Sequence, residues 1–243
     1  MVMKALYEPT GRAKEYADLA VNTYRGCSHG CTYCYAPAAT HRTREQFAKP
    51  EPRIGILEAL EQDCAGRKDI KRAPVLLSFS HDPYMPIEAE HKLTRGAIEI
   101  LHRHGFPVII LTKAGALAQR DFDLLGPQDK FGVTLTTLSM RDAAIWEPQA
   151  ALPLARVANL VQAYLRRIPT WVSCEPVLDP FWTSEVIKAT SHYVDEYKIG
   201  TWNHDVRAKE IDWPKFARDV VKLLDSLGKR YYLKADLREK GKL

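Results

Sequence analysis

Runs of apolar and β-branched residues alternate along the chain with segments whose apolar residues recur every three or four positions. The first pattern predicts strands and the second predicts helices, because side chains alternate in a strand and repeat about every 3.6 residues in a helix. The predicted strands are Ala20–Tyr24, Val75–Phe79, Val108–Leu111, Phe131–Thr136, Thr170–Ser173, Tyr197–Gly200 and Arg230–Leu233. The predicted helices lie within residues 54–61, 93–101, 155–165 and 216–227.

Strands that alternate with helices of about 10–15 residues predict an α/β fold built of βαβ units, with a parallel sheet. Around six such units suit a partial (β/α)6 TIM-type barrel. The alternative is a flat doubly wound sheet, but the chain has no Gly-rich dinucleotide fingerprint after its first strand. No Gly/Ser-rich linker divides the sequence, so we predict one domain over 1–243, with an N-terminal extension (1–20), a partial barrel (21–235) and a basic tail (236–243).

Composition adds few constraints. A hydrophobic content of 46% is ordinary for a globular chain, and there is no apolar run of about 18 residues, so no membrane partner is expected. Residues 1–16 lack the apolar core of a signal peptide, and three of the five cysteines are clustered, which disfavours a disulfide framework. We therefore expect a cytoplasmic protein.

The net charge of +5 permits nucleic-acid binding without demanding it. The basic residues form three groups, each of which is equally consistent with a solvated surface. They are Arg42, Arg44 and Lys49; Arg67, Lys68, Lys71 and Arg72; and the segment from Lys229 to Lys242.

The most informative motif is a set of three cysteines within eight residues, Cys27, Cys31 and Cys34. Thiolates are the ligands of iron–sulfur clusters, and three ligands on a four-iron cluster leave one iron open for chemistry. Two alternatives remain. One is a structural zinc loop with His29 as the fourth ligand, and the other is a coincidence of buried thiols.

Polar residues gather where predicted strands end, which in a barrel is the side that carries the chemistry. Ser78, Ser80 and Asp82 could hold an ammonium group, or could simply form a turn. Lys113 follows four apolar residues and Thr112, where the chain leaves the core, and could pair with a carboxylate or be a plain surface lysine.

Further along the chain, Thr134 and Thr136 share one strand face by alternation. In a barrel this face would be the interior, so both could contact the cofactor, although threonine is also simply a good strand former. Glu175 is a possible ribose or substrate contact. Cys174 could donate a hydrogen atom, although an isolated cysteine in a strand is more often a small buried hydrophobe.

The C-x-x-x-C-x-x-C spacing with Tyr33 before the third cysteine resembles the cluster loop of the radical SAM superfamily. Other stretches are similar to its spore-photoproduct-lyase-like (DNA repair photolyase-like) group, over nearly the whole chain. They include Tyr7–Ala13, Asn22–Cys27, Asp82–Tyr84, Trp146–Pro148, Glu175–Pro176 and Tyr231–Lys234. The resemblance implies a [4Fe–4S] cluster on Cys27, Cys31 and Cys34, with S-adenosylmethionine on the open iron.

The resemblance also implies roles for individual residues. Ser78, Ser80 and Asp82 match the strand end that contacts the amino group of S-adenosylmethionine, and Lys113 matches a lysine at its carboxylate. Tyr33 and Tyr35 match the tyrosines beside the third cysteine, one of which serves the hydrogen-atom return path in the lyase. The lyase also uses a cysteine near the end of the second strand, where this chain has Leu77-Ser78-Phe79-Ser80.

We therefore expect a radical SAM enzyme that acts on a nucleic-acid base or nucleotide, presented as a single strand or flipped out of a duplex. An external electron donor such as flavodoxin or ferredoxin would reduce the cluster. The alternatives are a radical SAM enzyme acting on a peptide or small metabolite, and a non-catalytic metal-containing protein that binds nucleic acid.

Overall fold

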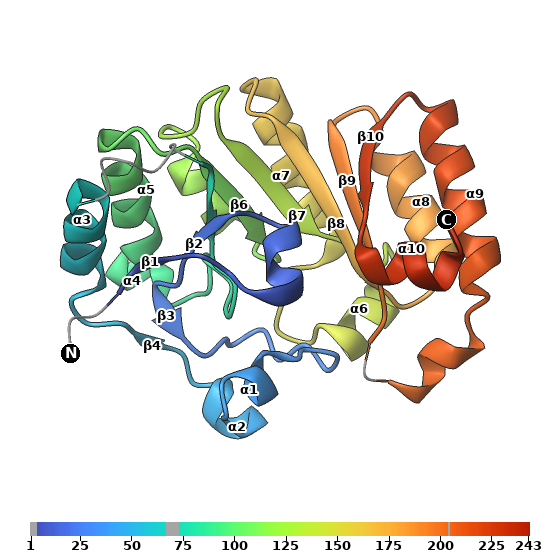
Figure 1. Cartoon of the computed structure of the whole chain (residues 1–243), viewed down its shortest axis with the longest axis horizontal. Helices are drawn as coiled ribbons and strands as arrows, with labels where there is room; N and C mark the ends of the chain where they lie inside the picture. The colour runs from blue at the N-terminus through green and yellow to red at the C-terminus, as the bar shows by residue number, and fades with distance from the viewer. Residues whose placement is uncertain (1–3, 67–72, 204) are drawn as a thin grey trace.

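The central sheet of the computed structural model has eight strands and does not close on itself; the structure describes residues 4–66, 73–203 and 205–243 (Figure 1). In spatial order the strands are β1 (Leu6–Tyr7), β2 (Leu19–Val21), β5 (Val75–Leu77), β6 (Val108–Thr112), β7 (Lys130–Thr134), β8 (Thr170–Val177), β9 (Glu196–Thr201) and β10 (Arg230–Leu233). The pairs from β2 to β10 are parallel, and β1 is antiparallel to β2.

This strand order confirms the predicted partial barrel. From β2 to β10 the strands follow one another in chain order, whereas a doubly wound sheet reverses direction at a switch point. The seven predicted strands coincide with the seven parallel strands, apart from shifts of a few residues at their ends. The N-terminal extension contributes β1, which is the antiparallel edge of the sheet.

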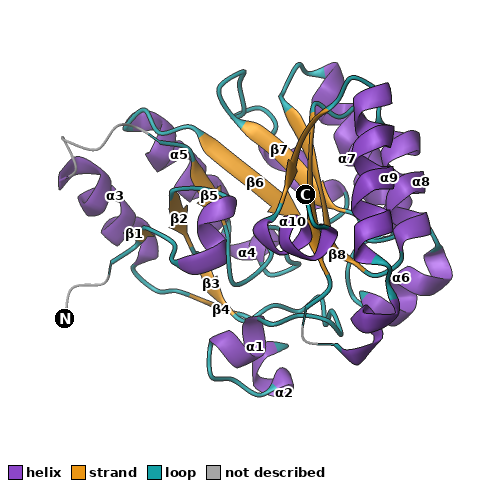
Figure 2. Ribbon diagram, turned by 45° about the vertical axis from the view of Figure 1, so that its right-hand side comes forward, coloured by secondary structure: helices purple, strands orange, loops and turns teal. Residues whose placement is uncertain are grey.

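Helices lie outside the sheet and connect its strands (Figure 2). The longer ones are α3 (Ile56–Gly66), α5 (Leu93–Arg103), α7 (Pro153–Leu165), α8 (Pro180–Thr190) and α9 (Trp213–Ser226). The shorter ones are α1 (Ala36–Ala39), α2 (Arg44–Phe47), α4 (Glu88–His91), α6 (Met140–Trp146), α10 (Ala235–Gly241), η1 (Gly11–Glu15), η2 (Ala116–Asp121) and η3 (Val206–Glu210). Among the described residues, no helix has both the length and the apolar character needed to cross a bilayer.

Helix α9 shows how the sequence builds this outer layer. Its buried residues include Phe216, Val220 and Leu224, whose spacing of four residues puts them on one helix face. Asp212 caps the helix by accepting a hydrogen bond from the backbone N–H of Lys215 (2.9 Å), and Gly228 follows the end at a positive φ of 61°. The helix therefore starts, ends and packs by local signals.

The interior of the barrel is filled near the amino ends of the strands by a tryptophan. Trp171 is buried and donates from Nε1 to the carbonyl oxygen of Ile110 (3.0 Å). Its indole lies directly over Gly132, where an added Cβ would be 2.3 Å from the ring. Glycine is thus required at this position, and the remaining interior space lies toward the carboxyl ends of the strands.

The N-terminal segment crosses the open side of the barrel and contacts strands on its far edge (Figure 1). Lys198 on β9 donates to the carbonyl oxygens of Glu15 (2.9 Å) and Tyr16 (3.2 Å). The Glu15 carboxylate accepts from the Tyr232 hydroxyl (3.1 Å) and the Ala235 N–H (2.7 Å). The segment therefore covers the interior between β2 and β10.

The C-terminal residues expected as a basic tail form a docked helix instead. Asp236, Leu237 and Gly241 of α10 are buried, and Lys240 donates to Thr201 and Asn203 at 3.3 and 3.2 Å. A buried leucine at one helix face explains why the segment packs on α9 and β9 rather than extending into solvent. The expected basic group at Arg67, Lys68, Lys71 and Arg72 lies outside the described residues.

Candidate cofactor and active site

A cavity of about 520 Å³ opens at the carboxyl ends of the strands. Most of the residues predicted from the sequence line it: Cys27, Cys31, Cys34, Tyr33, Tyr35, Ser78, Ser80, Asp82, Lys113, Thr134 and Glu175. The strand-end rule therefore located one site, built from segments that are far apart in the chain.

The cysteine loop is held in shape by the segment around α2. The N–H of Cys27 donates to the carbonyl oxygen of Phe47 (2.7 Å), and Gly26 has a φ of +86° at a point where a Cβ would lie 2.6 Å from that same oxygen. Arg44 donates to the carbonyl oxygens of Cys31, Thr32 and Cys34 at 3.2, 2.7 and 3.3 Å. Arg44, one of the basic residues considered for nucleic-acid contact, thus fixes the backbone between the second and third cysteines.

Two of the three thiols, those of Cys27 and Cys31, sit in an environment that disfavours their charge in the absence of metal. Burial, with a further contribution from the Asp82 carboxylate, raises the pKa of Cys27 to about 12, and burial raises the pKa of Cys31 to about 11. Iron would take the place of the proton, since cysteine binds metal as thiolate. Within the described residues, no three His, Cys, Asp or Glu side chains meet around the position of a single ion; the thiolates of a four-iron cluster bind separate irons and lie farther apart.

The carboxylate oxygens of Asp82 accept hydrogen bonds from other groups of the protein. They accept from the Tyr84 N–H (2.9 Å), the Thr112 hydroxyl (2.7 Å) and the Lys113 N–H (2.6 Å), and His29 Nδ1 lies 3.5 Å away. A carboxylate has about four acceptor positions, so Asp82 has little capacity left for an ammonium ligand. These contacts indicate that Asp82 positions the Lys113 backbone and the His29 ring.

Other predicted groups on the same wall have unused capacity. The buried Ser78 hydroxyl has no hydrogen-bond partner in the described residues. The Lys113 Nζ lies 5.7 Å from the centre of the Tyr33 ring, and no described carboxylate is within ion-pair distance of it. Burial lowers the pKa of Lys113, but nearby Cys31 and Glu147 raise it more, and the pKa stays above its ordinary value. A hydroxyl without a hydrogen-bond partner and a cation without a carboxylate partner fit the ammonium and carboxylate groups of an amino acid ligand.

Tyr33 is tied to a buried ion pair. Its hydroxyl donates to Glu147, and burial together with that carboxylate raises the pKa of Tyr33 well above its ordinary value. Glu147 and Arg156 are both buried, with Oε2 and Nη1 2.6 Å apart. Thr136 also donates to Glu147 (3.3 Å), beyond the end of β7, and is not among the described residues that line the cavity, whereas Thr134 is.

Tyr35 has a different setting from Tyr33. Its side chain is 56% exposed and stands at the edge of the cavity. The two tyrosines that flank Cys34 therefore differ, with one fixed against Glu147 and one presented to solvent.

The opposite wall is a closed polar network around Glu175. The carboxylate accepts from the Tyr16 hydroxyl and from Lys234 Nζ (2.9 Å), and the Ser173 hydroxyl lies 3.2 Å from that of Tyr16. Gly200 makes room for it, since a Cβ there would be 2.6 Å from the Glu175 carboxyl carbon. The predicted ribose contact is thus present on the cavity, but its carboxylate already has two partners.

The Cys174 side chain points away from the cavity. Side chains alternate along β8, so Ser173 and Glu175 face the cavity while Cys174 is buried in the core under the helices. Burial raises the pKa of its thiol to about 12. The structure thus supports a small buried hydrophobe, the alternative considered for this cysteine, and places its thiol away from the cavity.

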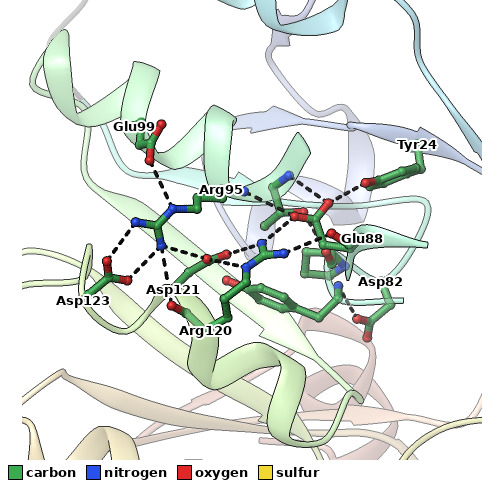
Figure 3. Close-up of polar contacts among 11 residues, drawn as sticks. Tyr24, Asp82, Glu88, Arg95, Glu99, Arg120, Asp121 and Asp123 are labelled. Carbon is green, nitrogen blue, oxygen red and sulfur yellow. Dashed lines mark hydrogen bonds and ion pairs between the residues drawn. The ribbon is translucent and has the colours of Figure 1, made fainter. Parts of the chain in front are cut away.

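A second buried network supports the loop that carries Asp82 (Figure 3). Glu88 is fully buried and accepts from Tyr24 (2.5 Å), the Thr94 N–H (3.0 Å) and Arg120 (2.6 Å). Asp121, also fully buried, lies between Arg120 and Arg95 at 2.7 and 3.2 Å. These charges are paired within the protein and hold the segment between β5 and α5, which includes Asp82.

Among the polar residues that line the cavity and that sequence reasoning missed are Tyr16 and Lys234. Lys234 follows the apolar end of β10 as Lys113 follows β6, so the rule that found one lysine could have found the other. Tyr16 reaches the cavity because the N-terminal segment crosses the barrel, and no local pattern reveals that path.

Comparison with known proteins agrees with this arrangement. The family model of the radical SAM superfamily matches residues 21–194. An uncharacterized protein of Acidianus two-tailed virus is 30% identical over 198 residues, which are 74% of this chain and 63% of the viral protein. An uncharacterized protein of Mycobacterium tuberculosis is 33% identical over 115 residues, or 43% of this chain and 32% of that protein. The matches thus span less than two thirds of either relative.

Two solved structures share the fold. A point mutant of spore photoproduct lyase has a TM-score of 0.73 at 11% identity, over 93% of this chain and 78% of the lyase. SuiB of Streptococcus suis bound to S-adenosylmethionine has a TM-score of 0.69 at 10% identity, over 91% of this chain and 51% of SuiB. At such low identity these likenesses concern the fold.

Proposed function

This chain belongs to the radical SAM superfamily, and from that premise we propose an enzyme that abstracts hydrogen from a nucleic-acid base or nucleotide. The family implies a [4Fe–4S] cluster and S-adenosylmethionine as cofactors. When bound, this pair supplies a 5′-deoxyadenosyl radical by reductive cleavage of S-adenosylmethionine. The observation that carries the proposal is one cavity that joins three cysteines to a hydroxyl without a hydrogen-bond partner and a cation without a carboxylate partner among the described residues.

The chain's residues divide the work of binding. Cys27, Cys31 and Cys34 would hold the cluster. Lys113 would pair with the carboxylate of S-adenosylmethionine, and Ser78 with Ser80 would accept hydrogen bonds from its ammonium group. Thr134 and Glu175 lie along the same cavity, where the nucleoside part and the substrate would lie.

The substrate class rests on the spore-photoproduct-lyase-like motifs and on fold likeness. A mutant of that lyase, solved with S-adenosylmethionine (AdoMet) and dinucleoside spore photoproduct, has a TM-score of 0.68 with this chain. The rim adds exposed Tyr35, which could stack on a base. The cluster must be reduced before it can act. An external donor such as flavodoxin or ferredoxin would supply the electron, which suits a protein of the cytoplasm.

A peptide substrate is the second candidate, since SuiB has been solved with its precursor peptide SuiA and shares the fold at a TM-score of 0.69. The test is an anaerobic screen of deuterated nucleosides, oligonucleotides and peptides with reconstituted, reduced protein and S-adenosylmethionine. We expect deuterium in 5′-deoxyadenosine with an oligonucleotide or nucleotide. Label from peptides alone would contradict the proposed substrate class, and no 5′-deoxyadenosine at all would contradict the enzymatic function.

A further inference from the structure

A second, smaller cavity of about 380 Å³ lies beside the first one, on the outer side of the cysteine loop. It is lined by three arginines and by neutral polar side chains, namely Arg25, Arg42, Arg53, Asn22, Thr40 and Ser80. Ser80 lines both cavities, so the two are neighbours across the end of β5. A ligand group here would lie next to whatever occupies the larger cavity.

The positive charge of this pocket is poorly compensated. In the described residues, no carboxylate lies within ion-pair distance of Arg25 or Arg53, and Arg42 has Glu51 at 3.7 Å on a side chain that is 66% exposed. Burial, together with the charge of Arg25, lowers the pKa of Arg53. Three arginines around one pocket, with a single exposed carboxylate (Glu51) near them, leave an excess of positive charge that indicates a place for an anion.

The pocket is also held rigid. Arg53 donates to the carbonyl oxygen of Asn22 (2.7 Å). The Asn22 amide in turn donates to Tyr7 (2.8 Å) and accepts from the N–H groups of Phe79 (2.8 Å) and Ser80 (3.1 Å). β3 (Tyr24–Arg25) pairs with β4 (Glu51–Pro52), which places Arg25 opposite Glu51 and fixes its backbone at the pocket that Arg53 also lines. Arg53 and the backbone of the pocket therefore need little reordering to bind a ligand.

We propose that this arginine pocket binds a backbone phosphate of a single-stranded nucleic acid whose adjacent base enters the larger cavity. The inference rests on the proposed function, because it assumes a polynucleotide substrate. Arginine suits the role, since its planar guanidinium donates two parallel hydrogen bonds to a phosphate. A concave pocket lined by three arginines fits a compact phosphate group better than the broad surface of an acidic protein.

The experiment compares the reconstituted wild-type protein with Arg25→Gln and with the Arg25→Gln/Arg42→Gln double variant. Arg25 is exposed, so its replacement should leave the fold intact. The matched control is Arg218→Gln, which removes the same charge from the exposed face of α9. Fluorescence anisotropy with labelled single-stranded dT and dA octamers is measured over a salt series, with inorganic pyrophosphate as competitor.

For Arg25→Gln we expect about tenfold weaker binding at low salt, and a salt slope smaller by about 0.7 for each phosphate that the variant no longer neutralises. The weakening should be equal for dT and dA octamers, because a phosphate contact carries no base information. Pyrophosphate should compete with the wild type and less well with the double variant. Arg218→Gln should behave as wild type.

Each contrary outcome has a distinct meaning. If the octamers bind but Arg25→Gln and Arg218→Gln give the same slope and affinity, the phosphate pocket is wrong and the nucleic-acid substrate stands. If no octamer binds the wild type at low salt, both ideas fail together.

Discussion

The two walls of the main cavity differ in how far their polar groups satisfy one another. The cluster wall, made of residues 27–34, Ser78 and Lys113, keeps free thiols, a hydroxyl without a partner and a cation without a carboxylate. The far wall, made of Tyr16, Ser173, Glu175 and Lys234, is linked by its own hydrogen bonds and an ion pair. Both walls are built from the carboxyl ends of strands, so their position in the fold does not explain the difference.

The free energy of burying a polar group explains this difference between the two walls. A buried polar group without a partner costs about 1–3 kcal/mol, so a fold retains one mainly where a ligand supplies the missing partner. The cluster wall would be completed by cofactors, whereas the far wall is complete in the folded chain. Removal of a cluster-wall residue should therefore reduce ligand binding, and removal of a far-wall residue should reduce stability.

The largest effect is expected at the cysteines. Serine at Cys27, Cys31 or Cys34 should abolish the charge-transfer absorbance of the cluster in anaerobically reconstituted protein, which should otherwise hold about four irons and four sulfides. Iron and sulfide analysis measures the outcome. The control is Cys174→Ala, which removes a thiol that faces the core and should leave the iron content unchanged. Tight zinc uptake without iron by the wild type would refute the cluster.

The next effect concerns the ion pair that anchors Tyr33 behind the cluster wall. Glu147→Ala leaves Arg156 buried without its partner and should lower the free energy of unfolding of the iron-free protein by about 3–5 kcal/mol. Denaturant titration measures it. As a control, replacing both partners (Glu147→Leu with Arg156→Met) should recover much of that stability, because no buried charge remains. A cost below about 1 kcal/mol for Glu147→Ala would mean that the pair is not a structural anchor.

A pH effect follows from His81, which joins β2 and β3 behind the cluster wall. Its Nε2 accepts from the N–H groups of Thr23 and Tyr24 (3.0 Å each), and burial lowers its pKa from 6.5 to about 4. The folded state needs the neutral ring, so this stability is complete above pH 6.5 and is lost as the pH falls toward 4. The decrease should be about 3 kcal/mol.

The measurement is the free energy of unfolding of the iron-free protein at a series of pH values. His81→Asn should flatten the curve between pH 6.5 and 4 relative to wild type. His91→Asn, on the exposed face of α4, should leave its shape unchanged. Identical slopes for the wild type and His81→Asn would show that His81 does not carry the effect.

Much of this site could be predicted because strand ends are local in sequence. Ser78 stands directly after an apolar run and Lys113 follows one after Thr112, and parallel strands bring such ends to one edge. The alternation along β8 also indicates that Cys174 and Glu175 face opposite sides, although it does not say which side is the cavity.

The features of the site that could not be predicted depend on contacts between segments that are distant in the sequence. Whether Asp82 is free or occupied depends on Thr112, Lys113 and Tyr84, whose approach no local pattern encodes. Tyr16 reaches the cavity only because its segment crosses the open barrel. The docking of α10 likewise depends on its packing against α9 and not on its basic composition.

The most direct test of the difference between the walls compares two lysines that both line the cavity, Lys113 and Lys234. We would titrate S-adenosylmethionine into reconstituted wild type, Lys113→Ala and Lys234→Ala by calorimetry, and record the melting temperature of each protein. Lys113→Ala should weaken binding by about 1.5–3 kcal/mol, or roughly 10- to 150-fold, with little change in melting temperature. Lys234→Ala should lower the melting temperature, because Glu175 loses its cation, and should bind S-adenosylmethionine nearly as the wild type does. If Lys113→Ala binds as tightly as wild type, or if Lys234→Ala is the variant that loses affinity, the cluster wall is not the part of the cavity that the cofactor completes.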